Sequence, residues 1–326
     1  MVSIILLAYN QGKFIREAVE GVLEQSYSPL EILISDDASP DNTFEIILEA
    51  VAEYNGPHRL IVNRNETNMG LCAHVAKAVT MTKGEWLVAT AGDDISSPNR
   101  CEKLVEAACA RERVSLVTSG WTEMMENGVS IETPLPRRFA DGRIDLWGDH
   151  KWCARFMRGS SVGVHGATSM WSRRLIEAFD QIASDVAAED AVMSFRAYLT
   201  GDVAYLPDRL VRYRRHSSNL CGSVHDDQEV AEHKAIAFEK RNSATLRQMR
   251  EDFEKYRVHL DNPMVVLKIS SCLEWLSYRH ETHVKWENHG TLWRLGRMIR
   301  CLRQRNKTEF MWCLRRLSAA YQREML

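Results

Sequence analysis

The stretch Val2-Ser-Ile-Ile-Leu-Leu-Ala8 is apolar at nearly every position. A run this short and continuous is typical of a strand that is buried on both faces of a parallel sheet. Residues 8–12, Ala-Tyr-Asn-Gln-Gly, break the run with turn-forming side chains, and apolar residues then return at helical spacing from Phe14 to Leu23. The start of the chain therefore predicts a strand, a polar loop and a helix.

Strand-like and helix-like segments continue to alternate as far as residue 97. The alternation predicts βαβ units, and hence an α/β fold with a Rossmann-like, mainly parallel sheet flanked by helices. Ligands of such sheets bind at the carboxyl ends of the strands. We expect strands at Leu30–Ser35, Arg59–Asn63 and Glu85–Thr90, helices at 44–51 and Leu71–Thr82, and polar loops at the binding edge at Ala8–Gly12, Asp36–Asp41 and Gly92–Ser97.

The second half of the chain is less regular until helical periodicity returns near residue 226. Ser115–Ser119 and Ala204–Pro207 predict short strands, and Arg137–Arg158 predicts a loop or helix over the binding edge. We therefore expect an α/β domain at residues 1–225 and an all-helical C-terminal extension at 226–326. The expected helices of the extension are Asp226–Arg257, Met264–His280, Thr291–Arg303 and Thr308–Arg323.

The 326 residues carry a formal net charge of -2, which argues against a nucleic-acid partner. The charge is uneven, because residues 289–326 hold nine Lys or Arg against two Asp or Glu, a local net charge of +7. The eight cysteines form no CxxC pair, so we expect them to be reduced and mostly buried. The apolar opening lacks the basic leader of a secretory signal and no run is long enough to span a membrane, which predicts a cytoplasmic protein.

Two adjacent carboxylates, Asp93 and Asp94, follow the expected strand Glu85–Thr90. An unpaired charge is costly to bury, whereas a hard divalent cation such as Mg²⁺ or Mn²⁺ prefers oxygen ligands and readily shares phosphates. The pair therefore predicts a metal site, with a solvated turn or a helix cap as the alternative. Asp36 and Asp37 are a second pair of adjacent carboxylates, after the second strand. They would either cap a helix or accept a hydrogen bond from a nucleoside.

Glu189 and Asp190 open an apolar helical stretch, Ala191–Leu199. The helix dipole alone favours acidic side chains in a first turn, and the functional alternative is a general base beside a reacting hydroxyl. Residues 212–219 gather three arginines, a histidine and two hydroxyls, which suit a pyrophosphate and, through His216, a metal. A basic loop on an acidic domain is the other interpretation of that segment.

Three common motifs are missing from the sequence. Gly12-Lys13 is followed by Phe14 and lacks the earlier glycine of a P-loop. No GxGxxG follows the first strand, which argues against a dinucleotide dehydrogenase, and Ser160 and Ser161 do not lie in a GxSxG turn. The acidic loops are therefore the main chemical signal.

An ordered series of motifs resembles family 2 glycosyltransferases over roughly residues 1–222. Each motif is weak alone, but their order along the chain is specific. The resemblance implies a GT-A fold and an inverting transfer of a sugar from a nucleoside-diphosphate donor to an acceptor hydroxyl. The motifs are Val2–Asn10, Ala18–Ser26, Glu31–Ser39, Asn68–Gly70, Lys83–Leu87, Gly92–Asp94, Glu189–Asp190 and Tyr213–His216.

The same resemblance implies roles for individual residues. Asp190 would be the catalytic base, and Asp94 and His216 would bind Mn²⁺ or Mg²⁺, which bridges the donor diphosphate. Residues 1–97 would form the nucleotide-sugar half of the domain and residues 98–225 the acceptor half. The residues expected to bind the donor are Ala8, Tyr9, Asn10, Asp37, Asn68, Lys77 and Asp93.

The sequence also departs from the family pattern and leaves alternatives open. His74 and Ala76 stand where many relatives have asparagines, and Gly92 replaces a residue that is often polar. The resemblance therefore does not assign the residues that contact the donor sugar. A sugar-phosphate nucleotidyltransferase would normally carry a glycine- and arginine-rich loop after its first strand, which this chain lacks. A noncatalytic assembly protein that retains the fold is the third interpretation.

The acceptor expected from the resemblance is a glycan or a lipid-linked glycan of a cell-surface polysaccharide. In Thr291–Arg303, apolar residues share one helical face and arginines surround them. This pattern fits either an interfacial helix on anionic lipid at the inner face of the membrane, or packing on the catalytic domain or on a second copy in a homo-oligomer.

Overall fold

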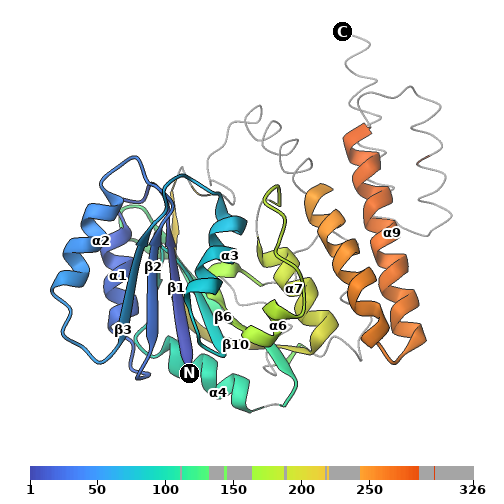
Figure 1. Ribbon diagram of the computed structural model, residues 1–326, viewed down its shortest axis with the longest axis horizontal. Helices are drawn as coiled ribbons and strands as arrows, with labels where there is room; N and C mark the ends of the chain where they lie inside the picture. The colour runs from blue at the N-terminus through green and yellow to red at the C-terminus, as the bar shows by residue number, and fades with distance from the viewer. Residues whose placement is uncertain are drawn as a thin grey trace, which may run out of the picture.

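The computed structural model describes residues 1–110, 112–131, 143–144, 164–186, 189–216, 219, 243–285 and 297 (Figure 1). A sheet forms the centre of the α/β part, and helices cover both of its faces (Figure 1). The strand order is β3-β2-β1-β4-β9-β6-β10-β5, with β7 paired to β6 and β8 paired to β10. The expected α/β architecture with a C-terminal helical region is confirmed.

The parallel part of the sheet comes from the start of the chain. β1 (Val2–Ala8) lies between β2 (Glu31–Asp36) and β4 (Trp86–Ala91), and β3 (Arg59–Arg64) is the edge strand beside β2. All four strands run parallel and agree with their expected positions to within one residue at each end. The three polar loops that follow β1, β2 and β4 therefore meet at one edge.

Both faces of β1 are buried, because successive side chains of a strand point to opposite faces and each face meets a helix layer. Ile5 packs in a core with one layer, and Ile4 and Leu6 pack in a second core with the other. This explains the continuous apolar run in the sequence. The first layer consists of α3 (Leu71–Met81), α6 (Arg173–Glu177) and α7 (Glu189–Thr200), and the second of α1 (Ile15–Leu23), α2 (Thr43–Ala52) and α4 (Arg100–Cys109).

Two strands of the second half are much longer than expected. β6 (Val114–Met125) and β10 (Asp202–Arg215) pair in parallel along most of their length, with register shifts between Leu206 and Val211. Proline has no amide hydrogen, so Pro207 interrupts the ladder locally and the strand resumes after an irregularity. The prediction that this strand ends near Pro207 was wrong for that reason, and β10 continues to the binding edge.

A short antiparallel strand joins the two halves of the sheet. β9 (Ser169–Ser172) pairs with β4 on one side and with β6 on the other. Because β9 runs antiparallel to both, the turn η2 (Gly166–Thr168) at its amino end lies beside their carboxyl ends. The remaining short strands are β5 (Ile95–Ser96), β7 (Ser130–Ile131) and β8 (Arg143–Ile144).

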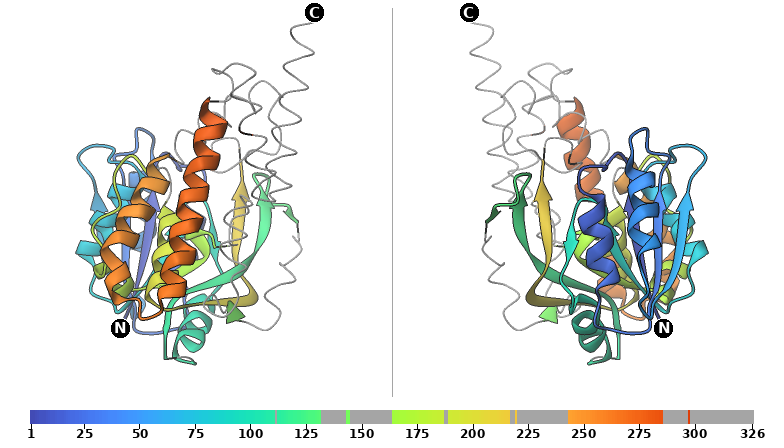
Figure 2. Two further views of the ribbon diagram at one scale, coloured as in Figure 1. Left: turned by 90° about the vertical axis from the view of Figure 1, so that its right-hand side faces the viewer. Right: turned by 90° about the vertical axis from the view of Figure 1, so that its left-hand side faces the viewer.

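The described part of the C-terminal region is helical. Residues 243–256 form a helix, η3 (Arg257–His259) a turn, and α9 (Pro263–Lys285) a second helix beside the first (Figures 1 and 2). These helices contribute to the core that contains α3 and α7, and Arg196 of α7 forms a buried ion pair with Asp252 at 2.7 Å. The expected helix Met264–His280 is confirmed and is longer than predicted, and the domain boundary near residue 225 stays a prediction.

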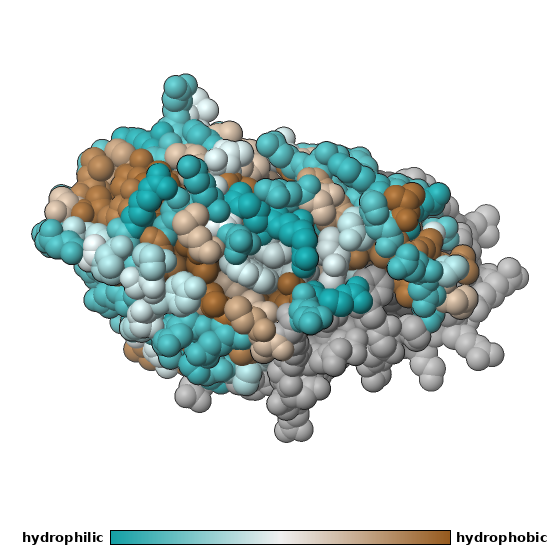
Figure 3. All heavy atoms as spheres, turned by 60° about the horizontal axis from the view of Figure 1, so that its bottom comes forward, coloured by the Kyte–Doolittle hydropathy of each residue, from teal (hydrophilic) through white to brown (hydrophobic). Residues whose placement is uncertain are grey.

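Several sequence-based expectations fall outside the described residues. They are the expected helices Thr291–Arg303 and Thr308–Arg323 except residue 297, most of Arg137–Arg158, and the first part of Asp226–Arg257. Across the described parts of the chain, no helix is long and apolar enough to cross a membrane. Figure 3 shows a face on which polar side chains predominate and apolar ones gather in separate patches. Among the described cysteines, Cys72, Cys101 and Cys272 are buried as expected, whereas Cys109 is exposed.

Candidate active site

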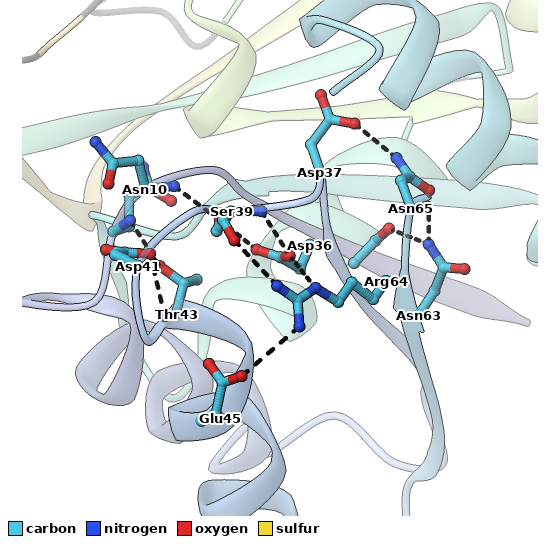
Figure 4. Close-up of polar contacts among 12 residues, drawn as sticks. Asn10, Asp36, Asp37, Ser39, Asp41, Thr43, Glu45, Asn63, Arg64 and Asn65 are labelled. Carbon is cyan, nitrogen blue, oxygen red and sulfur yellow. Dashed lines mark hydrogen bonds and ion pairs between the residues drawn. The ribbon is translucent and has the colours of Figure 1, made fainter. Parts of the chain in front are cut away.

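The loops after β1 and β2 hold each other in place at the binding edge (Figure 4). Asn10 (φ 55°) and Ala38 (φ 59°) adopt the left-handed backbone conformation that residues other than glycine rarely take. The amide of Asn10 donates to Ser39 Oγ at 2.9 Å, and the amide of Ser39 donates to Asp36 Oδ2 at 2.9 Å. Asp36 is buried and lies 3.5 Å from Arg64 Nε. Asp36 therefore orders the loop that carries Asn10 instead of facing a ligand.

Asp37 is buried and surrounded by donors. Its Oδ1 accepts hydrogen bonds from Asn65 Nδ2 at 2.7 Å and from the amide of Met69 at 3.0 Å, and its Oδ2 accepts one from the amide of Gly70 at 3.0 Å. Asn68 Oδ1 also accepts from the amide of Gly70, at 2.9 Å. The structure thus brings Asp37 and Asn68 together, with the carboxylate anchoring the turn before α3. A nucleoside that bonds to Asp37 must compete with these amides.

Lys77 reaches a network of amides between β2, β3 and α3. Its Nζ donates to Asn65 Oδ1 at 2.8 Å, and Asn63 Nδ2 donates to the same oxygen at 2.9 Å. Asn63 also donates to Ser35 Oγ at 2.8 Å, and Ser35 Oγ is 2.7 Å from His74 Nε2. Burial lowers the pKa of His74, which favours the neutral ring. His74, a departure from the family pattern, therefore belongs to this buried network.

Ala8 and Tyr9 lie at the carboxyl end of β1. Ala8 is buried, and its carbonyl accepts a hydrogen bond from the amide of Asp37 at 2.9 Å. The Tyr9 side chain is 47% exposed, so its ring is accessible at the rim. The structure therefore places Ala8 as a structural link between two loops and Tyr9 as an available contact surface.

The acidic loop after β4 begins with a glycine that has no room for a side chain. A β-carbon added to Gly92 would lie 2.3 Å from Gln11 Oε1 and 3.1 Å from the β-carbon of Ala8. The amide of Gly92 donates to the carbonyl of Leu7 at 2.9 Å. Close contact with the loop after β1 explains why this chain has glycine here. The contact also fixes where the next two residues, Asp93 and Asp94, begin.

Asp94 is the most buried acidic side chain at the edge of β4, with 1% of its surface exposed. Its Oδ1 accepts a hydrogen bond from the amide of Arg214 at 2.8 Å, whereas its Oδ2 is buried with no hydrogen-bond partner among the described residues. Burial, and then the neighbouring charge of Asp93, raise the pKa of Asp94 well above its usual range. A buried carboxylate oxygen without a donor is the arrangement that a bound cation would satisfy.

His216 lies beside the acidic loop, at the end of β10. Its Nε2 is 2.9 Å from Asp93 Oδ2, and its ring centroid is 4.8 Å from that of Phe14. Arg214 Nε donates to the carbonyl of Asp93 at 3.0 Å. The structure therefore brings together the three residues expected near the metal, although they come from segments more than 100 residues apart in the sequence.

The donor set fits a divalent cation that takes only part of its ligands from protein. Among the described residues, no group of three or more His, Cys, Asp and Glu side chains forms a complete metal site. Asp94 offers the unpaired oxygen, and His216 now bonds to Asp93. Mg²⁺ and Mn²⁺ commonly complete their coordination with substrate phosphates and water. We therefore regard this as a partial site that a diphosphate would complete.

Arg100, the first residue of α4, was not identified as a site residue from the sequence, but its buried side chain bonds to elements that form the site. Its buried guanidinium donates to the carbonyl of Ala89 at 2.8 Å, the carbonyl of Ala167 at 2.7 Å and Ser96 Oγ at 2.9 Å. These bonds link β4, β5 and η2. The available sequence signal was its position: Arg100 shares the buried face of α4 with Leu104.

Asp190 and Glu189 begin α7, as predicted, and both are largely buried. Asp190 Oδ1 accepts a hydrogen bond from the amide of Ala191 at 2.7 Å. Burial raises the pKa of Asp190, and nearby His165 opposes that rise. Burial, and then the charge of Asp190, raise the pKa of Glu189 to about 7. Gly166 leaves room for Glu189, because an added β-carbon would lie 2.0 Å from Glu189 Oε1.

Aromatic and charged side chains near Asp190 were not recognised from the sequence. The ring centroids of Trp121 and His165 are 4.4 Å apart in an edge-to-face contact, and those of His165 and Tyr213 are 6.1 Å apart. Arg215 lies over the Tyr213 ring at 5.0 Å and donates to Glu123 Oε1 at 2.5 Å. Of these residues, Tyr213 and Arg215 lay in a motif already noted, whereas the others had no local signal.

Residues 3–161 match the family model described as Glycosyl transferase family 2. Over that segment, just under half of its length, the chain is similar to this family. Bacillus subtilis EpsH, which carries a provisional glycosyltransferase name, is 27% identical over 285 residues, covering 84% of this chain and 77% of EpsH. Uncharacterised proteins of Mycobacterium tuberculosis and Mycobacterium bovis are 29% identical over 69% of this chain, and the chain spans 62% of their length.

Two solved structures show that the chain has the GT-A fold. S. aureus TarS 1–349 in complex with UDP matches with a TM-score of 0.63 and 16% identity, over 99% of this chain and 91% of that one. The mannosyltransferase PcManGT from Pyrobaculum calidifontis, in complex with GDP-Man and Mn²⁺, matches with a TM-score of 0.53 and 16% identity, over 96% of this chain and 83% of that one.

β10 separates two groups of side chains at the binding edge. Successive residues of a strand point to opposite faces. Arg214 and His216 meet Asp93 and the acidic loop, whereas Tyr213 and Arg215 meet the aromatic and charged residues near Asp190. The site therefore has an acidic side formed with the loops of β1 and β4, and an aromatic side that contains the expected base.

Proposed function

We propose that the chain is an inverting glycosyltransferase that moves a sugar from a nucleoside-diphosphate donor to an acceptor hydroxyl. The observation that carries this proposal is the buried, unpaired oxygen of Asp94 beside Asp93 and His216, at the edge of a parallel sheet where ligands bind. UDP in TarS and GDP-Man in PcManGT support a nucleotide-sugar donor for this fold.

The donor would lie on the acidic side of the site. In this proposal Tyr9 and Asn10 contact the nucleoside, and Asp37 and Asn68 hold or contact it through the turn before α3. Lys77, which now bonds to Asn65, would orient that turn. Asp93 would lie near the ribose and the diphosphate, and the rigid coupling of the loops after β1 and β2 keeps these contacts preorganised.

Asp94 and His216 would hold Mn²⁺ or Mg²⁺ at the diphosphate, with Asp93 beside them. When bound, the cation supplies positive charge that stabilises the negative charge of the leaving diphosphate. The Mn²⁺ in PcManGT supports this choice of cofactor. Arg214 contributes by fixing Asp94 through its amide and the acidic loop through its guanidinium.

Asp190 would be the general base. The acceptor oxygen attacks the anomeric carbon while Asp190 takes its proton, and the bond from that carbon to the diphosphate oxygen breaks with its electron pair leaving on the nucleoside diphosphate. A single displacement of this kind inverts the anomeric configuration. Burial raises the pKa of Asp190 toward the working pH, where a general base is most effective.

The physiological acceptor in this proposal is a glycan or a lipid-linked glycan of a cell-surface polysaccharide. A cytoplasmic location, with or without contact at the inner face of the membrane, and self-association belong to the same proposal. The basic segment that would decide between lipid binding and protein packing, Thr291–Arg303, lies outside the described residues except for residue 297.

A binding panel tests the proposal. The full chain with Mn²⁺ is heated alone and with UDP-glucose, UDP-galactose, UDP-N-acetylglucosamine, GDP-mannose and a dTDP-linked sugar. We expect one nucleotide family to raise the Tm, and to do so only weakly in Asp94→Asn, because a ligand stabilises only the folded state that binds it. A nucleotidyltransferase would instead release pyrophosphate from a nucleoside triphosphate and a sugar 1-phosphate, and that result would overturn the proposal.

A further inference from the structure

Four side chains project from the same face of two neighbouring strands near Asp190. In the parallel pair β6 and β10, Tyr213 lies opposite Glu123, and Val211 lies opposite Trp121. Opposed residues, and residues two apart, share a face of a sheet. Trp121, Glu123, Tyr213 and Arg215 therefore point to one side, away from the face that carries Arg214 and His216.

The rings of this group form a connected surface. His165, which precedes η2, makes an edge-to-face contact with Trp121 at 4.4 Å and lies 6.1 Å from Tyr213. All three rings are partly buried and partly exposed. The Arg215–Glu123 pair borders them, with the guanidinium 5.0 Å from the Tyr213 ring centroid and 2.5 Å from the carboxylate. We call Trp121, His165 and Tyr213 the aromatic platform.

The aromatic platform adjoins the proposed base. A β-carbon added to Gly166, the residue after His165, would lie 3.8 Å from the β-carbon of Asp190. An acceptor hydroxyl must reach Asp190, whereas the diphosphate belongs with Asp93 and His216 on the other side of β10. A group that the platform holds therefore lies on the side of β10 where the acceptor is expected, and not on the side where the nucleotide is expected.

We propose that the aromatic platform holds a pyranose ring of the acceptor beside Asp190, an inference that rests on the glycosyl-transfer function proposed above. The C–H face of a pyranose is apolar and slightly positive, and an aromatic face is negative, so the two attract as they desolvate. The hydroxyl groups at the ring edge suit the Arg215–Glu123 pair. A polyprenyl chain has the apolar surface but no groups for that ion pair.

Saturation-transfer difference NMR on the full chain tests the platform, with UDP and Mn²⁺ present to occupy the acidic side. The probes are methyl β-D-glucopyranoside, methyl β-D-galactopyranoside and methyl N-acetyl-β-D-glucosaminide, with glycerol as a polyol that has no ring. We expect at least one pyranoside to receive saturation on its C–H face and glycerol to receive none.

Substitution of Trp121 then locates the binding. Trp121→Leu keeps apolar bulk and removes the ring, and Trp121→Phe keeps a smaller ring in case the leucine variant fails to fold. We expect Trp121→Leu to weaken pyranoside binding by about tenfold or more, a loss of about 1.4 kcal/mol, and Trp121→Phe to weaken it less. Trp86→Phe, at the amino end of β4, is the matched control and should bind as the unchanged protein does.

The outcomes separate the platform from the proposed function. Pyranoside signal no stronger than that of glycerol, or signal that survives in both Trp121 variants, overturns the platform. The nucleotide-sugar panel described above is run on the same protein. If nucleotide sugars bind and pyranosides do not, only the proposal for the aromatic platform is wrong. If no nucleotide sugar binds, the proposed glycosyl-transfer function is wrong, and the platform proposal fails with it.

Discussion

The backbone amide of Arg214 donates a hydrogen bond to Asp94 Oδ1 at 2.8 Å and thereby joins the end of β10 to the loop after β4, across 120 residues of sequence. One oxygen of Asp94 is fixed by this bond, and the other is buried with no partner among the described residues. Because the bond uses the backbone of Arg214, substitution of the arginine side chain should leave it intact. The relationship makes Asp94 the residue on which the proposed metal site depends most.

Substitution of Asp94 should uncouple nucleotide binding from the metal. In the unchanged protein, we expect Mn²⁺ to tighten the binding of the nucleoside diphosphate released by the preferred donor, as measured by isothermal titration calorimetry. Asp94→Asn keeps the shape and the bond from Arg214 but removes the anionic ligand, so it should lose most of this gain, about tenfold or more. Asp208→Asn, at a part-exposed carboxylate paired with Lys103, is the control and should keep the Mn²⁺ effect. Equal Mn²⁺ effects in both variants would contradict the site.

Substitution of Asp190 should slow sugar transfer without weakening donor binding. Asp190→Asn is nearly isosteric but cannot accept a proton, so kcat should fall by about two to four orders of magnitude, the usual size of a general-base contribution. The Kd for the donor should stay within about twofold. Because a base must be deprotonated and burial raises the pKa of Asp190, activity of the unchanged protein should decline on acidification at a pH above the usual 3.8 of an aspartate. Near-normal turnover of Asp190→Asn would assign the base to another residue.

Substitution of Glu189 should change how stability depends on pH. The pKa of Glu189 is raised from 4.5 to about 7 on folding, so the folded state holds a proton that the unfolded state releases. This group therefore costs no stability below pH 4.5, and stability is lost as the pH rises toward 7 and above. The shift corresponds to roughly 3 kcal/mol at pH 8. Glu189→Gln should therefore be more stable than the unchanged protein at pH 8 and nearly equal to it at pH 4.5.

Urea unfolding at pH 4.5, 6, 7 and 8 measures this difference. Glu20→Gln, at an exposed glutamate of α1, is the control and should shift stability by less than about 0.5 kcal/mol at every pH. A Glu189→Gln difference that is constant across the pH range would mean that Glu189 is not the group that binds the proton.

Substitution of Arg100 should destabilise the fold. Arg100→Met removes the donors to two backbone carbonyls and to Ser96, and of these acceptors the Ala89 carbonyl and Ser96 Oγ stay buried. Each unsatisfied buried acceptor costs about 1–3 kcal/mol, which should exceed the gain from removing a buried charge. We expect a loss of about 2–4 kcal/mol in the free energy of unfolding. Arg16→Met breaks an exposed ion pair with Glu49 and should cost less than about 1 kcal/mol. Equal losses in the two variants would contradict the claim that the hydrogen bonds of Arg100 stabilise the fold.

The first half of the fold could be predicted because local patterns determine it. β1 is buried on both faces, so every side chain of Val2–Ala8 except that of Leu7 is buried. The apolar run in the sequence therefore predicts this strand directly. The polar loops then follow from the strand ends. Asp93, Asp94 and His216 could be brought together only through the family resemblance, and the structure places them in one cluster.

The rest depended on long-range pairing that no local pattern contains. β10 carries a proline and alternating arginines, so it lacks the apolar signal of a strand, yet it pairs with β6. Trp121 and His165 meet only because β9 lies between β4 and β6 and brings η2 to the same edge. Arg100 bonds to Ala167 for the same reason. These contacts follow from the order of strands in the sheet, which the sequence alone did not predict beyond β4.

The central claim is most directly tested by following nucleotide-sugar turnover at the Asp94 site. The full chain, Asp94→Asn and Asp190→Asn are each incubated with the nucleotide sugar that raises the Tm and with the methyl pyranosides named above as acceptors, with Mn²⁺ or with excess chelator. NMR follows nucleoside diphosphate release and the anomeric configuration of the glycoside product. The account predicts release of the nucleoside diphosphate by the unchanged protein with Mn²⁺, an inverted product, and loss of at least about a hundredfold in each variant and with chelator. Equal release by Asp94→Asn and the unchanged protein, or a product that retains its configuration, would contradict it.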